Sequence, residues 1–349
     1  MLRAVARERV WARVGAPRRV VLDIDATLIT SHSEKEGAAG TYKDGYGFNP
    51  LLCFEASTGD PMSGVLRPGN AGANHAWDHI EVLCLALEQV PERVDRRGVL
   101  VRCDSAGATH RLTDTIVDLE MCFSVGFDLT ERVREAILRL PESAWRSALS
   151  ADGEIRAGAE VAEFADLDLS AWPAGTRAIC RRERPHPGAQ LPHTDHDGHR
   201  FQRSSSPTRP AAGSSGSSNS TTSERVSRTA SAAPRTRASE TCPFATFQPN
   251  AAWLELVLIG QDLIACTQRL LLAGTPAHRW EPKRLRYRLP HVAGRLTRHA
   301  RRTRMHLPAA WPWRHELVTA WQRLGALQPP AGCRWLRAGH GMCRGRCGS

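Results

Sequence analysis

The sequence predicts an α/β protein in which helices flank a mixed β-sheet. Short apolar runs bounded by turn residues, which are typical of strands, are concentrated between residues 20 and 66. Two stretches with apolar residues at helical spacing then alternate with two further apolar runs between residues 73 and 127. Strands followed by alternating helices and strands favour one mixed sheet with helices packed on it.

Residues 20–127 contain seven expected elements. In chain order they are strands at 20–25, 50–55 and 62–66, a helix at 73–90, a strand at 99–103, a helix at 109–119 and a strand at 122–127. The short links between the first three strands suggest a meander. The ribonuclease-H-like fold uses this same order and gathers acidic residues at adjacent strand ends. We therefore expect a ribonuclease-H-like mixed sheet.

The rest of the chain is less regular. Residues 131–149 are expected to form one or two helices, and polar strands at 153–169 and 176–182 are expected to form a β-rich insertion. Nearly continuous apolar positions predict a buried helix at 251–272. Residues 279–304 carry ten Lys or Arg side chains against one acid, with apolar residues every three or four positions. This pattern predicts a helical basic C-terminal part.

Composition favours a polyanionic partner. The chain of 349 residues has 47 Lys plus Arg against 36 Asp plus Glu and an isoelectric point near 9.6, which points to nucleic acid. Arg enrichment by a GC-rich genome is the alternative. Ten cysteines include no C-x-x-C pair, which fits a reducing cytoplasm. The charged start lacks the apolar core of a signal peptide, and no apolar run is long enough to span a membrane.

Two acidic residues stand at the ends of predicted strands. Asp25 lies in V-V-L-D-I-D-A-T-L, and Asp104 lies in V-L-V-R-C-D-S-A-G. Carboxylates at adjacent strand ends can hold two divalent cations about 3.5 to 4 Å apart for phosphoryl transfer, and hard oxygen ligands suit Mg²⁺ or Mn²⁺. A single Asp at a strand end is more often a capping or turn residue, so the pair alone is weak evidence.

Several longer runs resemble bacterial insertion-sequence transposases of the DDE class, in particular the insertion sequence thirteen-eighty group. The runs are L-D-I-D-A-T-L-I-T-S-H-S-E-K-E-G-A-A, K-D-G-Y-G-F-N-P-L-L, L-R-P-G-N-A-G-A-N, L-V-R-C-D-S-A-G-A-T-H, C-R-R-E-R-P-H-P-G-A-Q-L and R-W-E-P-K-R-L-R. The resemblance implies a ribonuclease-H-like domain that nicks element ends and transfers the 3′-hydroxyl to target DNA. It makes Asp25 and Asp104 catalytic metal ligands, with Asp23 the weaker choice for the first acid.

The stretch that should carry the third acid departs from the family pattern. Residues 203–246 contain no Leu, Ile, Met, Trp or Tyr and are rich in Ser, which predicts a disordered low-complexity segment. A shifted reading of GC-rich codons restores the family motif with its Glu, so we expect a frameshifted copy that is inactive. Glu224 and Glu240 are the substitutes within the segment. A non-catalytic DNA-binding remnant is the alternative function.

Further candidate residues follow from the basic segment and from the resemblance. The expected DNA-binding residues are Lys283, Arg284, Arg286, Arg295, Arg298, Arg301 and Arg302. A solvated basic face is the alternative for this set. Arg181, Arg182 and Arg184 are read either as DNA contacts or as a solubilising edge strand. His32, Lys35 and Glu36 lie in a matching stretch for which a structural turn is the safer interpretation.

A phosphatase of the haloacid-dehalogenase type is the rival enzyme class. D-I-D-A-T satisfies its D-x-D-x-T motif, with Asp23 as nucleophile and Asp25 as acid. The downstream Lys and acidic pair that this family also needs are not found.

The expected organisation has five parts. They are a remnant of a longer amino-terminal region at 1–18, a catalytic core with its insertion at 19–202, the low-complexity segment at 203–246, the helical basic region at 247–330 and a disordered tail at 331–349. Expected partners are the DNA of insertion-sequence ends and targets, without a membrane, in a cytoplasmic protein. A homodimer is left open.

Overall fold

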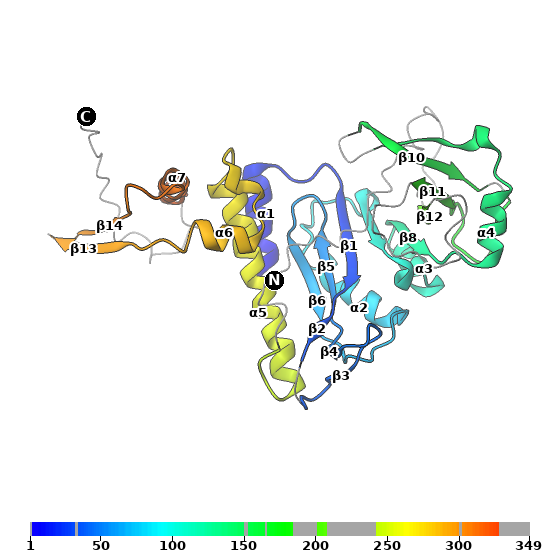
Figure 1. Cartoon of the computed structure of the whole chain (residues 1–349), viewed down its shortest axis with the longest axis horizontal. Coiled ribbons are helices and arrows are strands. Elements are labelled where there is room, and N and C mark those ends of the chain that lie inside the picture. The colour runs from blue at the N-terminus through cyan, green and yellow to red at the C-terminus, as the bar shows by residue number, and fades with distance from the viewer. Residues whose placement is uncertain are drawn as a thin grey trace.

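The chain folds around a mixed β-sheet with helices on both faces. The computed structural model describes residues 2–31, 34–149, 153–164, 166–183, 201–207, 242–299 and 302–327. Within them, the largest sheet has nine strands in the order β6-β5-β1-β7-β8-β12-β11-β10-β9 (Figure 1). The strands β1, β7 and β8 are parallel, and the other neighbours are antiparallel. The predicted α/β class with a mixed sheet is confirmed.

The elements have the following bounds. The strands of the large sheet are β1 (Val20–Ala26), β5 (Leu51–Glu55), β6 (Pro61–Val65), β7 (Val99–Cys103), β8 (Cys122–Phe127), β9 (Arg146–Leu149), β10 (Ile155–Glu163), β11 (Ile179–Glu183) and β12 (Phe201–Pro207). A small sheet contains β2 (Ile29–Thr30), β3 (Ala39–Gly40) and β4 (Tyr46–Phe48), and a hairpin contains β13 (Arg295–His299) and β14 (Arg302–His306). The helices are α1 (Leu2–Val14), α2 (Ala76–Leu87), α3 (His110–Asp118), α4 (Glu131–Leu138), α5 (Phe247–Cys266), α6 (Pro282–Arg288) and α7 (Arg314–Ala326).

The central strands were predicted almost to the residue. The expected strands at 99–103 and 122–127 are β7 and β8, and the three expected meander strands are β1, β5 and β6. The expected helices at 73–90 and 109–119 are α2 and α3. Their agreement has a simple cause, because the apolar pattern of each element matches the face that it buries.

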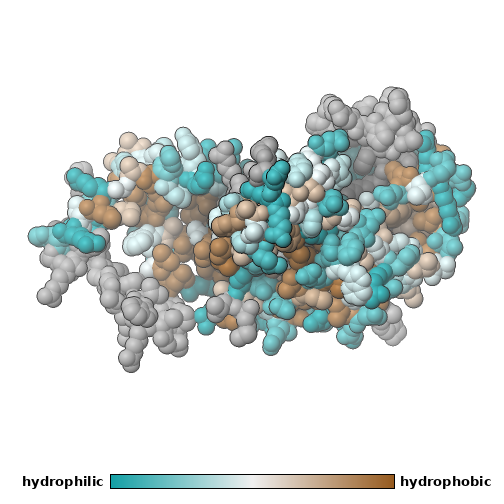
Figure 2. Space-filling model, turned by 90° about the horizontal axis from the view of Figure 1, so that it is seen from below, coloured by the Kyte–Doolittle hydropathy of each residue, from teal (hydrophilic) through white to brown (hydrophobic). Residues whose placement is uncertain are grey.

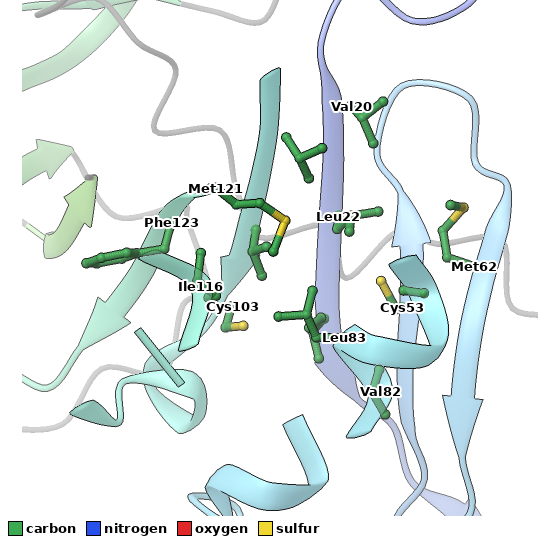
Figure 3. Close-up of a cluster of buried hydrophobic side chains, with 14 of the residues drawn as sticks. Val20, Leu22, Cys53, Met62, Val82, Leu83, Cys103, Ile116, Met121 and Phe123 are labelled. Atoms are coloured by element: carbon green, nitrogen blue, oxygen red, sulfur yellow. The ribbon is translucent and has the colours of Figure 1, made fainter. Parts of the chain in front are cut away.

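Two apolar clusters cover the two faces of the sheet near β1. On one face, Leu22 of β1 packs with Leu83 of α2 and Ile116 of α3, and all three side chains are fully buried (Figure 3). On the other face, α5 lies over β5 and β6, where Leu258 packs with Leu52. Side chains of a strand alternate between the faces. The sheet is therefore buried on both sides at β5 and β6.

The charged amino-terminal segment forms α1 and joins the main core. Trp11 is 1% exposed and donates its indole N–H to a carboxylate oxygen of Asp60 at 3.0 Å. Arg7 is 3% exposed and contacts Asp262 of α5 at 2.7 Å. Burial of the indole ring stabilises the docked helix by about 2 kcal/mol or more. Whether residues 1–18 are a remnant of a longer region stays a prediction.

Three expected elements differ from the structure. Within 131–149 the helix ends at Leu138, a proline follows at position 141, and residues 146–149 form β9. Residues 203–207, expected to be disordered, belong to β12 between β8 and β11. The helix expected to be buried at 251–272 leaves Leu256 59% and Leu263 65% exposed, so α5 buries only one side. Residues 208–241 of the Ser-rich segment and the tail from 328 lie outside the described residues.

The basic C-terminal region is not one helix. The helix α6 ends at Arg288, and the chain then forms the hairpin of β13 and β14. Pro290 lacks an N–H to continue the helical hydrogen bonds, and its ring would clash with the preceding turn of a helix. The apolar spacing that predicted a continuous helix was therefore misleading beyond residue 289.

Arg181 and Arg182 are neither an exposed edge nor a DNA surface. They are 4% and 7% exposed, and their strand β11 lies between β10 and β12. Arg182 pairs with Glu142 at 2.5 Å and Glu160 at 2.7 Å and lies over the Trp145 ring at 4.1 Å. These partners explain its burial, because a buried guanidinium needs paired acceptors. Arg184 lies outside the described residues.

None of the described helices is long and apolar enough to cross a bilayer.

Candidate active site

Strand register brings the two predicted acids together. Ile24 of β1 is paired with Cys103 of the parallel strand β7, so Asp25 and Asp104 occupy equivalent positions on neighbouring strands. Neighbouring strands lie about 4.8 Å apart. Ile24 and Cys103 point into the core beneath α2 and α3, and Asp25 and Asp104 therefore belong to the opposite face. Both acids are half-buried.

Asp104 also shapes the turn that follows β7. Its Oδ1 accepts a hydrogen bond from the backbone N–H of Ala106 at 3.0 Å and caps the 3₁₀ turn at Ser105–Gly107. The capping role considered for an isolated Asp is thus real for one oxygen. A carboxylate has about four lone-pair sites. Capping therefore fixes the orientation of Asp104 and leaves it able to bind a cation.

Two glycines allow this turn to pack closely. A Cβ on Gly107 would stand 2.3 Å from Cys103 Cβ, and a Cβ on Gly126 of β8 would stand 3.0 Å from the Ser105 nitrogen. Neither position has room for a side chain without movement of the turn. Gly107 is visible in the run C-D-S-A-G, whereas Gly126 carries no sequence signal beyond a glycine within a strand, which often marks close backbone approach.

Asp23 forms an ion pair with Arg102. Asp23 is 5% exposed, and Arg102 donates to both of its carboxylate oxygens, from Nε to Oδ1 at 2.5 Å and from Nη2 to Oδ2 at 2.6 Å. A bidentate pair of this kind is strong and geometrically fixed. The pair occupies both oxygens of Asp23, and Asp25 stays the predicted first metal ligand. The pair also disfavours the phosphatase alternative, which needs the Asp23 carboxylate as a nucleophile.

Three acidic side chains act on the buried Cys103 thiol. Burial raises the pKa of the Cys103 thiol well above its usual value, and the charges of Asp104, Asp23 and Asp25 raise this pKa further. The thiol is therefore inert as a nucleophile at neutral pH. On α2, burial lowers the pKa of His79, which is 2% exposed and donates from Nδ1 to the His75 carbonyl at 3.0 Å. His79 packs near Gly107 as a neutral core residue.

The donor set fits a divalent cation in part. Asp25 and Asp104 offer carboxylate oxygens, which Mg²⁺ and Mn²⁺ prefer. Among the described residues, no three His, Cys, Asp or Glu side chains form a group that could hold a metal ion. Glu224 and Glu240 lie outside the described residues. The described residues therefore place at most the two predicted acids at this site.

The stretch around residue 36 is structural. Lys35 donates from Nζ to the Cys242 carbonyl, and Glu36 accepts from the Phe247 backbone N–H at 2.8 Å. Phe247 begins α5, and a carboxylate at a helix N-terminus is stabilising. This confirms the interpretation of the segment as a structural turn for Lys35 and Glu36. His32 lies outside the described residues.

The predicted DNA-binding residues lie apart from the two acids. Lys283, Arg284 and Arg286 are exposed on α6, and Arg295 and Arg298 are exposed on β13. Arg302 begins β14, and Arg301 is outside the described residues. The α6 helix and the hairpin lie on the far side of α5 from β1 (Figure 1). Arg284 also lies over the Trp280 ring, with its Cζ 5.3 Å from the centroid.

A protein-family model matches most of the chain. The model is described as transposase DDE domain, group 1, and it matches residues 5–209 and 223–329. The chain belongs to this family. The predicted DDE transposase relationship is therefore confirmed, whereas the insertion sequence thirteen-eighty group and a bacterial source stay predictions. The matched ranges omit residues 210–222 and include 223–246, which is part of the segment expected to be out of frame.

A solved structure similar to this DDE-family chain is the piggyBac transposase synaptic complex with hairpin DNA. The TM-score is 0.40 and the identity 12%, over 82% of this chain and 55% of that chain. This chain thus spans about half the length of the piggyBac transposase chain. A search of curated protein sequences gives no match.

Proposed function

We propose that this chain is built as a DNA transposase whose metal-binding acids are Asp25 and Asp104. The observation that carries the proposal is their equivalent register at the ends of two parallel strands, within a chain that belongs to the DDE transposase family. The reaction class is nicking at element ends followed by transfer of the 3′-hydroxyl to target DNA. The cofactor is Mg²⁺ or Mn²⁺.

Some residues of the proposed site would bind the metal ion, and others position those ligands. A divalent ion held in such a site activates a nucleophile and stabilises the leaving oxygen during phosphoryl transfer. Asp25 and Asp104 would hold the ion through their carboxylate oxygen atoms. Arg102 forms an ion pair with Asp23, which offsets the charge of the acid that lies two residues before Asp25. Gly107 and Gly126 let the Asp104 turn approach closely.

We further propose that this copy cuts DNA poorly. Two-ion catalysis needs a third ligand, and the described residues supply no third acid at this site. Glu224 and Glu240 belong to a Ser-rich segment, and catalytic geometry tolerates displacements of only about 0.5 Å. Reading the gene from codon 195 to codon 255 in all three frames tests the frameshift directly. If no frame encodes the family's Glu motif, the frameshift is wrong.

Manganese binding tests the two ligands independently of activity. We expect electron paramagnetic resonance to detect Mn²⁺ bound to the full chain, and Asp25→Asn and Asp104→Asn each to weaken this binding by at least tenfold. Asp114→Asn is the control, because Asp114 is exposed on α3. If the two site variants bind Mn²⁺ as well as the control does, the proposed metal site is wrong.

DNA cleavage tests the activity separately. With a supercoiled plasmid and Mg²⁺ or Mn²⁺, we expect little nicking above that of Asp25→Asn. Rapid nicking that Asp25→Asn abolishes would support the transposase chemistry and overturn the proposed weak activity. DNA binding without cleavage is the second candidate function, and it is favoured by the exposed basic residues of α6 and β13.

A further inference from the structure

The β13–β14 hairpin is an arm with no place in the catalytic core. It projects beyond α6 at one end of the molecule, and the insertion strands lie at the opposite end (Figure 1). Residues 295–306 contain five arginines and two histidines and no acid. Two-stranded hairpins alone are only marginally stable in water. A strongly basic arm of this kind gains stability from a partner that supplies negative charge.

The two faces of the hairpin differ in chemistry. Residues paired across antiparallel strands share a face, and Arg295 is paired with His306, Thr297 with Arg304 and Leu296 with Met305. The basic face therefore carries Arg295, Thr297, His299, Arg304 and His306. The outer face carries Leu296, Arg298 and Met305.

The details of each face agree with this division. On the basic face, Thr297 Oγ1 lies 2.9 Å from His306 Nε2, which links the two strands. On the outer face, Leu296 and Met305 are 62% and 64% exposed. Figure 2 shows hydrophilic residues at this end of the molecule beside a small hydrophobic area. The charge is therefore concentrated on one face of the ribbon.

We propose that this hairpin is a ribbon that binds double-stranded DNA in the major groove through its basic face. The major groove is about 12 Å wide and admits a two-stranded β-ribbon, and guanidinium groups bind phosphate oxygens and guanine edges. The inference rests on the proposed function for the identity of the nucleic acid. It assigns the DNA contacts to Arg295 and Arg304, and it predicts that Arg298 does not contact DNA.

Two arginines of the same strand provide a matched test. Arg295 and Arg298 are both exposed on β13, three positions apart and on opposite faces. Binding of the full chain to a fluorescein-labelled 30-base-pair duplex of mixed sequence is measured by anisotropy in EDTA at several salt concentrations. We expect Arg295→Ala to reduce the slope of log affinity against log salt by about 1, the effect of one lost phosphate contact. Arg298→Ala should leave the slope unchanged.

A double variant and a second nucleic acid complete the test. Arg295→Ala with Arg304→Ala should reduce the salt slope by about 2. Double-stranded RNA should bind more weakly, because the deep and narrow major groove of A-form RNA does not admit side chains. Equal effects of Arg295→Ala and Arg298→Ala on the salt slope would overturn the assignment of the DNA contacts to one face. Equal affinity for the RNA and DNA duplexes would overturn the proposed binding in the major groove.

These measurements separate the arm from the catalytic proposal. They need no metal, and Asp25→Asn should bind the DNA duplex as the unmodified chain does. If the arginine variants leave the salt slope unchanged, the proposed DNA binding by the hairpin is wrong, whereas the Mn²⁺ result is unaffected. If Asp25→Asn and Asp104→Asn do not weaken Mn²⁺ binding but Arg295→Ala lowers the salt slope, DNA binding by the hairpin is supported and the metal-site assignment is wrong.

Discussion

Asp60 holds together three parts of the molecule, and its removal gives the sharpest stability prediction. The residue is 2% exposed and lies in the turn before β6. Its Oδ2 accepts from Trp11 Nε1 of α1 at 3.0 Å and from Arg269 Nη1, which follows α5, at 2.8 Å. Arg7 Nε is 3.8 Å from the same oxygen. Asp60→Ala therefore removes the one acceptor that these three donors share.

The expected loss of stability depends on which hydrogen-bond acceptors each donor still has without Asp60. Removing one partner of a buried ion pair costs about 3–5 kcal/mol, and a buried donor left without an acceptor costs about 1–3 kcal/mol. Arg7 keeps Asp262 at 2.7 Å, so its charge stays compensated. Arg269, with its side chain 11% exposed, and the Trp11 indole lose this acceptor. We expect a decrease of about 3 kcal/mol in the free energy of unfolding.

Urea unfolding followed by tryptophan fluorescence measures this change. Asp114→Ala on the exposed side of α3 is the control and should change the free energy of unfolding by less than about 0.5 kcal/mol. Asp60→Asn keeps an oxygen acceptor and should fall between the control and Asp60→Ala. If Asp60→Ala costs less than about 1 kcal/mol, α1 is not held to the core by this network.

Two further predictions concern the surroundings of the site. Burial lowers the pKa of His79, so the unfolded chain gains a proton that the folded chain does not, and stability should fall as pH drops below the unfolded value of about 6.5. In thermal unfolding between pH 5 and 8, His79→Asn should reduce this slope, whereas His315→Asn on exposed α7 should not. Gly107→Ala should cost about 1–3 kcal/mol and weaken Mn²⁺ binding, because its Cβ would meet Cys103. Gly98→Ala, which has open space around it, should do neither.

Local patterns predicted the central sheet but not the way in which distant charges pair. Val99–Cys103 and Cys122–Phe127 are buried strands whose apolar runs are visible in the sequence. The sequence also indicated Asp25 and Asp104, because each follows such a run. The predicted exposure of Arg182 was wrong, because a basic residue on a polar strand suggests an exposed side chain. Its acidic partners, Glu142 and Glu160, are 40 and 22 positions away.

The C-terminal region shows a different limit of sequence reasoning. Apolar residues at three- and four-residue intervals from 285 to 296 satisfied a helical period. The structure places Leu285 in α6 and Leu296 in β13, and residues 289–294 between them belong to neither element. Pro290 was the available signal against a continuous helix. The difference changes the functional interpretation, because a strand presents alternate residues on one face and so separates Arg295 from Arg298.

The identity of the first acid depends on register, which the sequence does not state. D-I-D places Asp23 and Asp25 on the same face of β1, and R-C-D places Arg102 and Asp104 on the same face of β7. The observed register sets Asp23 against Arg102, so the inner acid is paired, and Asp25 and Asp104 follow at equivalent positions. A slip by one residue would turn Leu22 and Ile24 out of the core. Burial of these apolar residues on one face therefore fixes which carboxylates lie on the other face.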